Sequence, residues 1–288
     1  PVKGSGIANV MNAYAKVGML EEELFRALSR EAKQLPVKGF EGQHVANILN
    51  AAVKAGWEDE ELFERMKGVL LSKSESHMSP QAVALILNAY ARAGLHDNAL
   101  FAHMSKLVQR HVSEGGESMS PQSVANVLNA CAAGGFKDPE LMDRLCAVCA
   151  AMTGGDGLML RHIGNILNAL VRLGHVDLPA FRRMSSLAQS LPVAQADAQS
   201  LSLIANAFAK AEHKDTSLFS YLSATAQSLD RSSFNPQSIA LLANAFAKAG
   251  IRDHTLFKVL CEHVLTQRPD DFDEQSIANI VNAFARSF

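Results

Sequence analysis

The chain has 288 residues, 48% of them hydrophobic and 19% charged, which is typical of a folded protein with a sizeable core and excludes a disordered chain. Its formal net charge is −2, so an argument for nucleic-acid binding cannot rest on bulk charge and must rest on where the charges lie. No apolar run reaches the roughly 18–20 residues that a membrane-spanning helix needs, so no membrane partner is expected.

Nearly the same dozen residues recur along the chain, as VANILNAAVKAG at 45–56, VALILNAYARAG at 83–94 and IALLANAFAKAG at 239–250. In all eight copies Ala follows the central Asn, and successive copies lie 38, 38, 41, 39, 38, 38 and 38 residues apart. The central Asn residues are Asn12, Asn50, Asn88, Asn129, Asn168, Asn206, Asn244 and Asn282. This period predicts a solenoid in which each unit packs only on its neighbours.

Each copy is predicted to form two helices, A and B. Helix A begins at phrases such as SPQAV (79–83), SPQSV (120–124) and NPQSI (235–239), where Ser or Asn caps the helix and Pro takes the first helical position. It ends near a Gly six residues after the central Asn, because Gly tolerates the left-handed conformation that stops a helix. These glycines are Gly18, Gly56, Gly94, Gly135, Gly174 and Gly250.

Helix B is predicted to begin at an acidic residue that caps it, and its first apolar pair is usually Leu-Phe, as at 62–63 and 218–219. The capping residues are Asp59, Asp97, Asp138, Asp177, Asp215 and Asp253. Eight A helices and seven B helices are therefore expected. Gly-rich polar loops at 113–120 and 153–158 account for the two longer intervals.

The predicted fold is all-α: an α-solenoid of about eight 38-residue helix-turn-helix repeats that form a superhelix, with the A helices on the concave side. We expect residues 1–288 to form a single helical-repeat array. Because the first residue is Pro1 and the last falls inside a copy of the repeat, we also expect this array to be part of a longer chain.

One arc of helix A is predicted to be buried core. At about 100° per residue, the positions five, two and one before the central Asn and two after it share that arc. In the second copy they are Val45, Ile48, Leu49 and Ala52, and in the seventh Ile239, Leu242, Ala243 and Phe246. The aromatic residues of the motif fall on the same side, so base stacking is not indicated.

The opposite face of helix A carries a polar stripe at seven, three and zero residues before the central Asn and four after it. The first position holds Gln43, Gln81, Gln122, Gln199, Gln237 and Gln275, with Arg161 in the fifth copy. The second holds Asn9, Asn47, Asn126, Asn165 and Asn279, with Leu85, Leu203 and Leu241 elsewhere. The last holds Lys16, Lys54, Arg92, Arg172, Lys210, Lys248 and Arg286, and Ala133 alone interrupts this cation row.

The stripe is interpreted as an RNA-binding surface. Stacked helices lie about 8–10 Å apart, close to the screening length of ~8 Å at physiological salt, so a row of cations would be relieved by a polyanion. Carboxamides beside them suit base edges and sugar hydroxyls, although a solvated polar face is the simpler alternative. For the central Asn we favour bridging between repeats. Small residues bordering the stripe leave room either for a ligand or for close helix packing.

The two-helix unit with PQSIA…NAFAKAG…D…LF resembles the octotricopeptide and heptatricopeptide repeats. It is also similar to helical-repeat subunits of kinetoplastid mitochondrial RNA-editing substrate-binding complexes. The resemblance covers essentially the whole chain. It implies a protein of mitochondria or, alternatively, plastids that binds organellar RNA, in some protists within the mitochondrial ribosome, together with other proteins of a ribonucleoprotein complex.

Other chemistry is not indicated. Cys146 and Cys149 form a lone C-x-x-C without the second pair that a zinc site needs, and His44 and His162 share a repeat position without a recurring acidic partner. No nucleophile–base arrangement recurs, so we expect neither an enzyme, nor a metal, nor a cofactor.

Two functions remain open. The first is an organellar RNA-binding protein that contacts the RNA backbone with weak sequence preference, acting on transcripts or held on rRNA in a mitochondrial ribosome. The alternative is a protein-binding scaffold within an organellar complex, which would use the same groove for a peptide or a helix.

Overall fold

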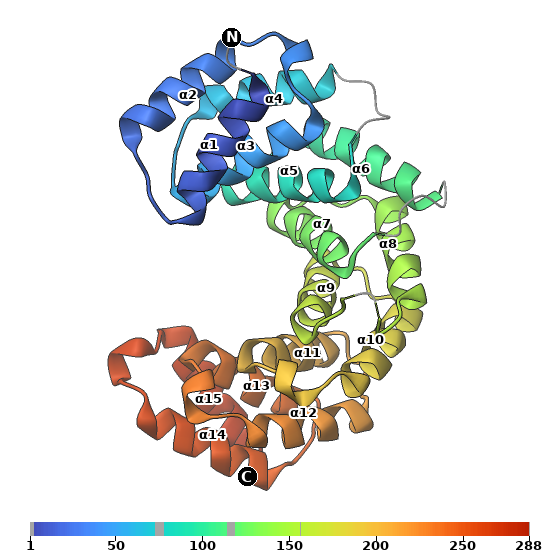
Figure 1. Cartoon of the computed structure of the whole chain (residues 1–288). Coiled ribbons are helices and arrows are strands. Elements are labelled where there is room, and N and C mark those ends of the chain that lie inside the picture. The colour runs from blue at the N-terminus through green and yellow to red at the C-terminus, as the bar shows by residue number, and fades with distance from the viewer. Residues whose placement is uncertain (1–2, 73–77, 114–118, 156, 288) are drawn as a thin grey trace. The chain divides into compact units, whose positions relative to one another are not determined.

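The computed structural model describes residues 3–72, 78–113, 119–155 and 157–287, and the α-helices in these ranges alternate between the two predicted types (Figure 1). The A helices are α1 (Gly4–Lys16), α3 (Gly42–Ala55), α5 (Pro80–Arg92), α7 (Pro121–Gly134), α9 (Leu160–Leu173), α11 (Ala198–Lys210), α13 (Pro236–Lys248) and α15 (Glu274–Ser287). The B helices are α2 (Glu22–Gln34), α4 (Glu60–Leu71), α6 (Asn98–Ser113), α8 (Pro139–Ala151), α10 (Leu178–Ser190), α12 (Thr216–Ser228) and α14 (His254–Thr266). The predicted eight A and seven B helices are confirmed for the described residues.

Short 3₁₀ turns join some B helices to the next A helix, at Val37–Gly39 (η1), Val193–Gln195 (η3), Arg231–Ser233 (η4) and Pro269–Asp271 (η5). Residues 114–118 and 156, which belong to the two predicted Gly-rich loops, lie outside the described residues. No strand is present in the described ranges, and the all-α class is confirmed.

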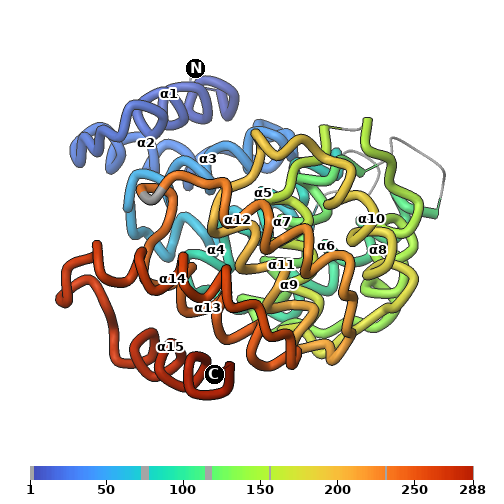
Figure 2. Tube along the Cα trace, turned by 90° about the horizontal axis from the view of Figure 1, so that it is seen from below, coloured from blue at the N-terminus to red at the C-terminus, as the bar shows by residue number. Residues whose placement is uncertain are grey.

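The chain divides into two compact units, Pro1–Leu145 and Cys146–Phe288. In the first unit α1, α3, α5 and α7 pack side by side in chain order, and in the second α9, α11, α13 and α15 do the same (Figure 2). The B helices α2, α4, α6, α10, α12 and α14 each pack on the A helix of their own repeat and on at least one neighbouring B helix. Each unit is therefore an α-solenoid with an A layer and a B layer. The concave placement of the A layer stays a prediction.

The predicted helix ends are confirmed. The Ser79, Ser120 and Asn235 side chains accept hydrogen bonds from backbone N–H groups at the starts of α5, α7 and α13, and Pro occupies the first helical position in each. All six predicted terminal glycines have φ between 65° and 74°, the left-handed region in which glycine is unstrained. Glu212 takes this place in the sixth repeat, with φ 54°.

The Asp that begins most of the B helices also ties that helix to the B helix before it. One oxygen of Asp97 accepts from the Leu100 N–H at 2.9 Å, and the other pairs with Lys67 of the preceding B helix at 2.7 Å. Asp215 caps α12 in the same way and accepts from the Ser185 hydroxyl of α10 at 2.6 Å. Asp59, Asp138, Asp177 and Asp253 cap their helices likewise. The confirmed caps therefore help to set the spacing of the B layer.

The core arc of helix A is buried as predicted, with all four positions of the second and seventh copies fully inaccessible. Aromatic pairs join one repeat to the next. The rings of Phe219 and Phe246 meet edge to face with centroids 4.9 Å apart, and those of Phe257 and Phe284 do so at 5.1 Å. Burial of the motif aromatics is why the A face offers few rings for stacking on bases.

Small residues allow the A helices to pack closely. The position four before the central Asn and the position directly after it are buried in the interior repeats. A Cβ atom added to Gly164 would lie 3.2 Å from both the Leu203 Cβ atom and the Ser200 carbonyl oxygen of the next A helix. Of the two roles that the sequence left open for these small residues, close helix packing is the one present.

Within the described residues, the last A helix, α15, is not covered on its core side. Ile277 and Val281 occupy core-arc positions of α15, yet 48% and 61% of their surfaces are exposed, because no described helix covers this side of α15. None of the described helices is long and apolar enough to cross a membrane.

Truncation of a ring that joins two repeats should be costly. We expect Phe219→Ala and Phe257→Ala each to lower the free energy of unfolding by about 3–5 kcal/mol, because both side chains are fully buried. Urea titration followed by circular dichroism measures this change. A loss below about 1 kcal/mol would contradict the packing described for helix B.

The ion pair between Lys67 and Asp97 should make the free energy of unfolding depend on pH in the acidic range. The hydrogen bond from Lys67 holds the pKa of Asp97 below its ordinary 3.8, so the stabilisation is present above that value and is lost as pH falls through the folded-state pKa. Asp97→Asn keeps an acceptor for the Leu100 N–H but cannot titrate. The unfolding midpoint of the parent should therefore fall more than that of the variant between roughly pH 5 and pH 2. Equal falls would show that the pair contributes nothing.

Candidate nucleic-acid interface

The polar stripe lies along one ridge of each A helix and is most exposed at its two ends. The first stripe position is exposed in every repeat from the second to the eighth, and so are all seven members of the cation row. The Asn residues between them lie deeper: Asn47, Asn126, Asn165 and Asn279 are half-buried, and Asn9 is exposed. From the second repeat to the eighth, each A helix thus has a Gln or Arg at one end of the stripe and, except in the fourth, a cation at the other, with the central Asn between them.

The central Asn does not bridge repeats as predicted. Six of the eight are half-buried, Asn206 is buried and Asn282 is exposed. Within the part of the chain that the structure describes, none of their side chains forms a hydrogen bond with another residue of the protein. The correction has a physical reason: the small residues beside each Asn bring the A helices together by apolar contact, and the carboxamide stays on the open ridge. These amides can therefore donate to and accept from a ligand.

Six of the seven cations of the row have no internal partner among the residues that the structure describes. In the described ranges, Lys16, Lys54, Arg92, Lys210, Lys248 and Arg286 form neither a hydrogen bond nor an ion pair. The B layer uses several of its cations differently. Lys33 pairs with Asp59 and Glu61 of the next repeat, at 3.3 and 2.9 Å, and the Arg65 guanidinium donates to the Leu35 carbonyl at 2.6 Å. Several B-layer cations therefore hold repeats together, whereas six of the seven cations in the row have no internal partner within the described ranges.

Charge is segregated between the A helices and the rest of the chain. The A helices hold eight Lys or Arg residues and a single acidic residue, Glu274, which gives them a formal charge of +7. Because the whole chain carries −2, the B helices and connections together carry −9. The weakly acidic total thus conceals a basic layer, and Arg161 adds an eighth cation to the stripe.

Helix dipoles give an alternative reason for a cation in the last turn of helix A, since the carbonyl end of a helix attracts positive charge. That reason would apply equally to the B helices. However, α4, α8, α10 and α12 have no basic residue in the last turn, whereas every A helix except α7 has one. The dipole alone therefore does not account for the row.

The remaining candidates from the sequence have structural roles. Nδ1 of His44 accepts from the Glu41 N–H, and Nδ1 of His162 accepts from the Met159 N–H, which explains their shared repeat position as helix capping. Cys146 and Cys149 are buried, and burial raises the pKa of the Cys149 thiol well above its ordinary range. In the residues described, no group of three His, Cys, Asp or Glu side chains is arranged to hold a metal ion.

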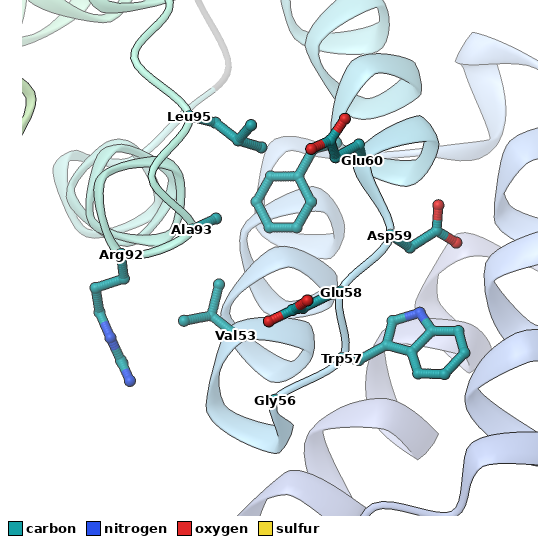
Figure 3. A pocket seen from close by; sticks show the side chains of 10 residues that line it. Val53, Gly56, Trp57, Glu58, Asp59, Glu60, Arg92, Ala93 and Leu95 are labelled. Carbon is teal, nitrogen blue, oxygen red and sulfur yellow. The ribbon is translucent and has the colours of Figure 1, made fainter.

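Two clefts occupy equivalent places in the two units. In each, the turn between helices A and B of one repeat faces the last turn of the next A helix. The cleft of the first unit has a volume of about 320 Å³ and is lined by Val53, Gly56, Trp57, Glu58, Asp59, Glu60, Phe63, Arg92, Ala93 and Leu95 (Figure 3). The cleft of the second has about 310 Å³ and is lined by Phe208, Ala209, Glu212, His213, Lys214, Lys248 and Ala249.

The turn residues of these clefts were missed by the sequence reasoning. A cation stands eight residues after the central Asn in three repeats, as Lys137, Lys214 and Arg252, and the first of these belongs to the repeat in which Ala133 interrupts the row. All three are exposed. Alignment of the turns, rather than of helix A alone, contains the signal that reveals them.

A model of the RNA-editing substrate-binding complex 6 protein family matches residues 2–195 and 192–287. The chain belongs to this family. The two matches together extend over nearly all of the array, which agrees with a family defined by the helical repeats themselves. Assignment to the octotricopeptide or heptatricopeptide type stays a prediction.

Comparison with curated proteins gives no match. Among solved structures, this RNA-editing substrate-binding complex 6 family member resembles a homology model of the full-length AP-3 complex in an intermediate open conformation. The identity is 12% and the TM-score 0.40, over 97% of this chain and 48% of that one, so the chain spans about half the length of its match. A computationally designed self-assembling cyclic homo-oligomer aligns with 14% identity and TM-score 0.14 over 100% and 85% of the two chains. Neither likeness bears on function.

We expect that cations of the row can be replaced without loss of stability. Changing Lys54, Arg92, Lys210 and Lys248 together to Gln should alter the free energy of unfolding by less than about 0.5 kcal/mol per site, because none has an internal partner. Arg65→Gln should cost about 1 kcal/mol or more, because it leaves the Leu35 carbonyl without its donor. Thermal and urea unfolding compare the two, and marked destabilisation of the quadruple variant would contradict the exposed, unpaired placement of the row.

Proposed function

We propose that the protein is an RNA-binding subunit of a mitochondrial RNA-editing substrate-binding complex, and that it holds single-stranded RNA by neutralising phosphates along the A layer. The observation that carries this proposal is the row of cations at one repeat position of the A layer. Six of its seven members have no partner among the described residues, whereas several B-layer cations, such as Lys33, Lys67 and Arg144, pair with acidic side chains. A row of unpaired cations at one repeat position fits a regular polyanion.

The open amides of the stripe complement the cations. Carboxamides both donate and accept hydrogen bonds, so Asn and Gln side chains can follow sugar hydroxyls and base edges of any sequence. The repeats carry the same amides at most positions, and identical contacts cannot distinguish one base from another. We therefore expect tight binding with weak sequence preference, in which phosphates position the strand.

The family favours RNA editing over the ribosome as the setting. Its description refers to a substrate-binding complex of RNA editing, and nothing in the chain or its comparisons supports rRNA binding. Mitochondrial localisation follows from the same setting, and the role is one of binding rather than catalysis. Crosslinking in cells, followed by sequencing of the attached RNA, tests the setting: recovery of transcripts or guide-like RNA supports it, and recovery of rRNA alone overturns it.

Phosphate contact by the row should appear as a change in salt dependence. With Lys54, Arg92, Lys210 and Lys248 all changed to Gln, the slope of log affinity against log salt for single-stranded RNA should flatten by about 0.7 per residue, or roughly 3 in total. Affinity should fall by a similar factor for RNAs of unrelated sequence. Fluorescence anisotropy with labelled oligonucleotides at several salt concentrations measures both.

The matched control changes four exposed B-layer cations, Arg26, Lys106, Arg182 and Lys258, to Gln, because each is exposed and without an internal partner in the described ranges. This variant has the same net charge as the row variant, so only position differs. Equal changes in slope would mean that general charge, and not the row, attracts RNA. If neither variant changes RNA affinity and the row variant instead loses a protein partner, the scaffold alternative replaces the proposal.

A further inference from the structure

The two turn clefts have the same construction and opposite charge. Position by position, Glu58 in the first unit corresponds to Lys214 in the second, and Arg92 corresponds to Lys248. The first cleft contains three acidic side chains and one cation. The second contains two lysines and a histidine against one carboxylate, that of Glu212. A phosphate group would be repelled by the first cleft and attracted by the second.

The two lysines reach the second cleft from different repeats. Lys214 belongs to the turn before α12, and Lys248 is the last residue of α13. Both are exposed, and neither forms an ion pair in the described ranges. The next junction of this unit repeats the pairing with Arg252 in the turn and Arg286 near the end of α15. The second unit thus carries cations in two rows, one on each side of its junctions.

Glu212 is the residue that the fold itself does not require. The corresponding residue of the six other turns is a glycine with φ of 65–74°. Glu212 adopts φ 54°, a backbone conformation that residues other than glycine seldom take. Its carboxylate is exposed and has no hydrogen-bond or ion-pair partner in the described residues. A carboxylate in this place only accepts hydrogen bonds.

The cleft therefore combines two positively charged lysines with one carboxylate that accepts hydrogen bonds. A bare anion would satisfy the lysines but would be repelled by the Glu212 carboxylate. A nucleotide satisfies both, because its phosphate carries the charge and its ribose carries hydroxyl donors. The volume of about 310 Å³ is at the small end of the range for ligand pockets, roughly 300–1,000 Å³, which suits one nucleotide and not a duplex. The His213 ring, tilted against Phe208 with centroids 5.6 Å apart, forms one wall.

We infer that the cleft formed by Glu212, His213, Lys214 and Lys248 holds one nucleotide of single-stranded RNA, with its phosphate between the two lysines and its ribose 2′-hydroxyl donating to Glu212. This inference rests on the proposed function and makes it more specific. The second unit holds RNA in this turn cleft as well as along the row. In the first unit RNA contacts the row alone, because Glu58 and Glu60 line the equivalent cleft and repel a phosphate there. The carboxylate supplies a preference for RNA over DNA.

The first test locates the strand on the full chain. A 12-residue single-stranded RNA containing 4-thiouridine is photo-crosslinked to the protein, and the attached peptides are mapped by mass spectrometry. Crosslinks within 208–214 or 248–249 are expected. Crosslinks concentrated in 56–60, the acidic turn of the first cleft, would overturn the inference.

The second test changes one charge at the cleft. Lys214→Glu should weaken binding of this RNA by about tenfold at low salt, while Lys106→Glu, the same substitution on the exposed B layer, should weaken it by less than about twofold. Equal losses would overturn the cleft. If Lys214→Glu has no effect while the quadruple row variant still loses affinity, the cleft fails and the proposed function stands. If neither has any effect, the proposed function fails as well.

The third test isolates the carboxylate. Glu212→Gly restores the residue found in the other turns, so the melting temperature should rise while the fold is kept. The ratio of RNA to DNA affinity, measured with oligonucleotides of one sequence, should fall toward one because the acceptor of the 2′-hydroxyl is removed. A ratio unchanged from that of the parent protein would overturn the role of Glu212.

Discussion

Close packing of each A helix on the next is the interaction on which the rest of this structure depends. It requires small residues at two positions that border the polar stripe, and at Gly164 even a Cβ atom would meet the next helix at 3.2 Å. Because both flanks of helix A are occupied by its neighbours and a third side by the core, only one ridge remains open. Equivalent side chains on this ridge recur at the spacing between neighbouring A helices. A residue type that the repeats share at one position therefore forms a row.

The B layer complements this arrangement, because its acidic side chains cap helices and pair with neighbouring helices. An Asp at the start of most B helices caps its own helix and accepts a hydrogen bond or ion pair from the helix before, as Asp97 and Asp215 do. Acidic residues thus collect in the turns and B helices, and the A helices keep a formal charge of +7 within a chain of −2. Net charge alone is a poor guide to the ligand of a layered protein, because the two layers face different surroundings.

Junctions between neighbouring repeats can differ from one another where the sequence departs from the repeat pattern. Interior positions cannot vary freely, since each must fit the same helix contacts. The A–B turns project beyond those contacts, so Glu58 and Lys214 can give two clefts of similar volume opposite charge. In the same way the left-handed turn position accepts Glu212 at the expense of backbone strain. Specificity in such an array is therefore expected at its turns and not along its helices.

The sequence by itself determined the repeat, the two helices of each unit, their caps and the buried arc, because these follow from local periodicity and from residues such as Pro80 and Gly56 whose backbone preferences are intrinsic. It also identified the cation row, since angular position on a helix is set by spacing alone. Only the tertiary structure decided that the small residues serve helix packing. It alone decided that the side chain of the central Asn forms no hydrogen bond with another residue in the described ranges. It alone revealed that Lys214 faces Lys248 across a junction. These are relations between repeats, and the distance between neighbouring helices depends on how their side chains interlock, which no single repeat specifies.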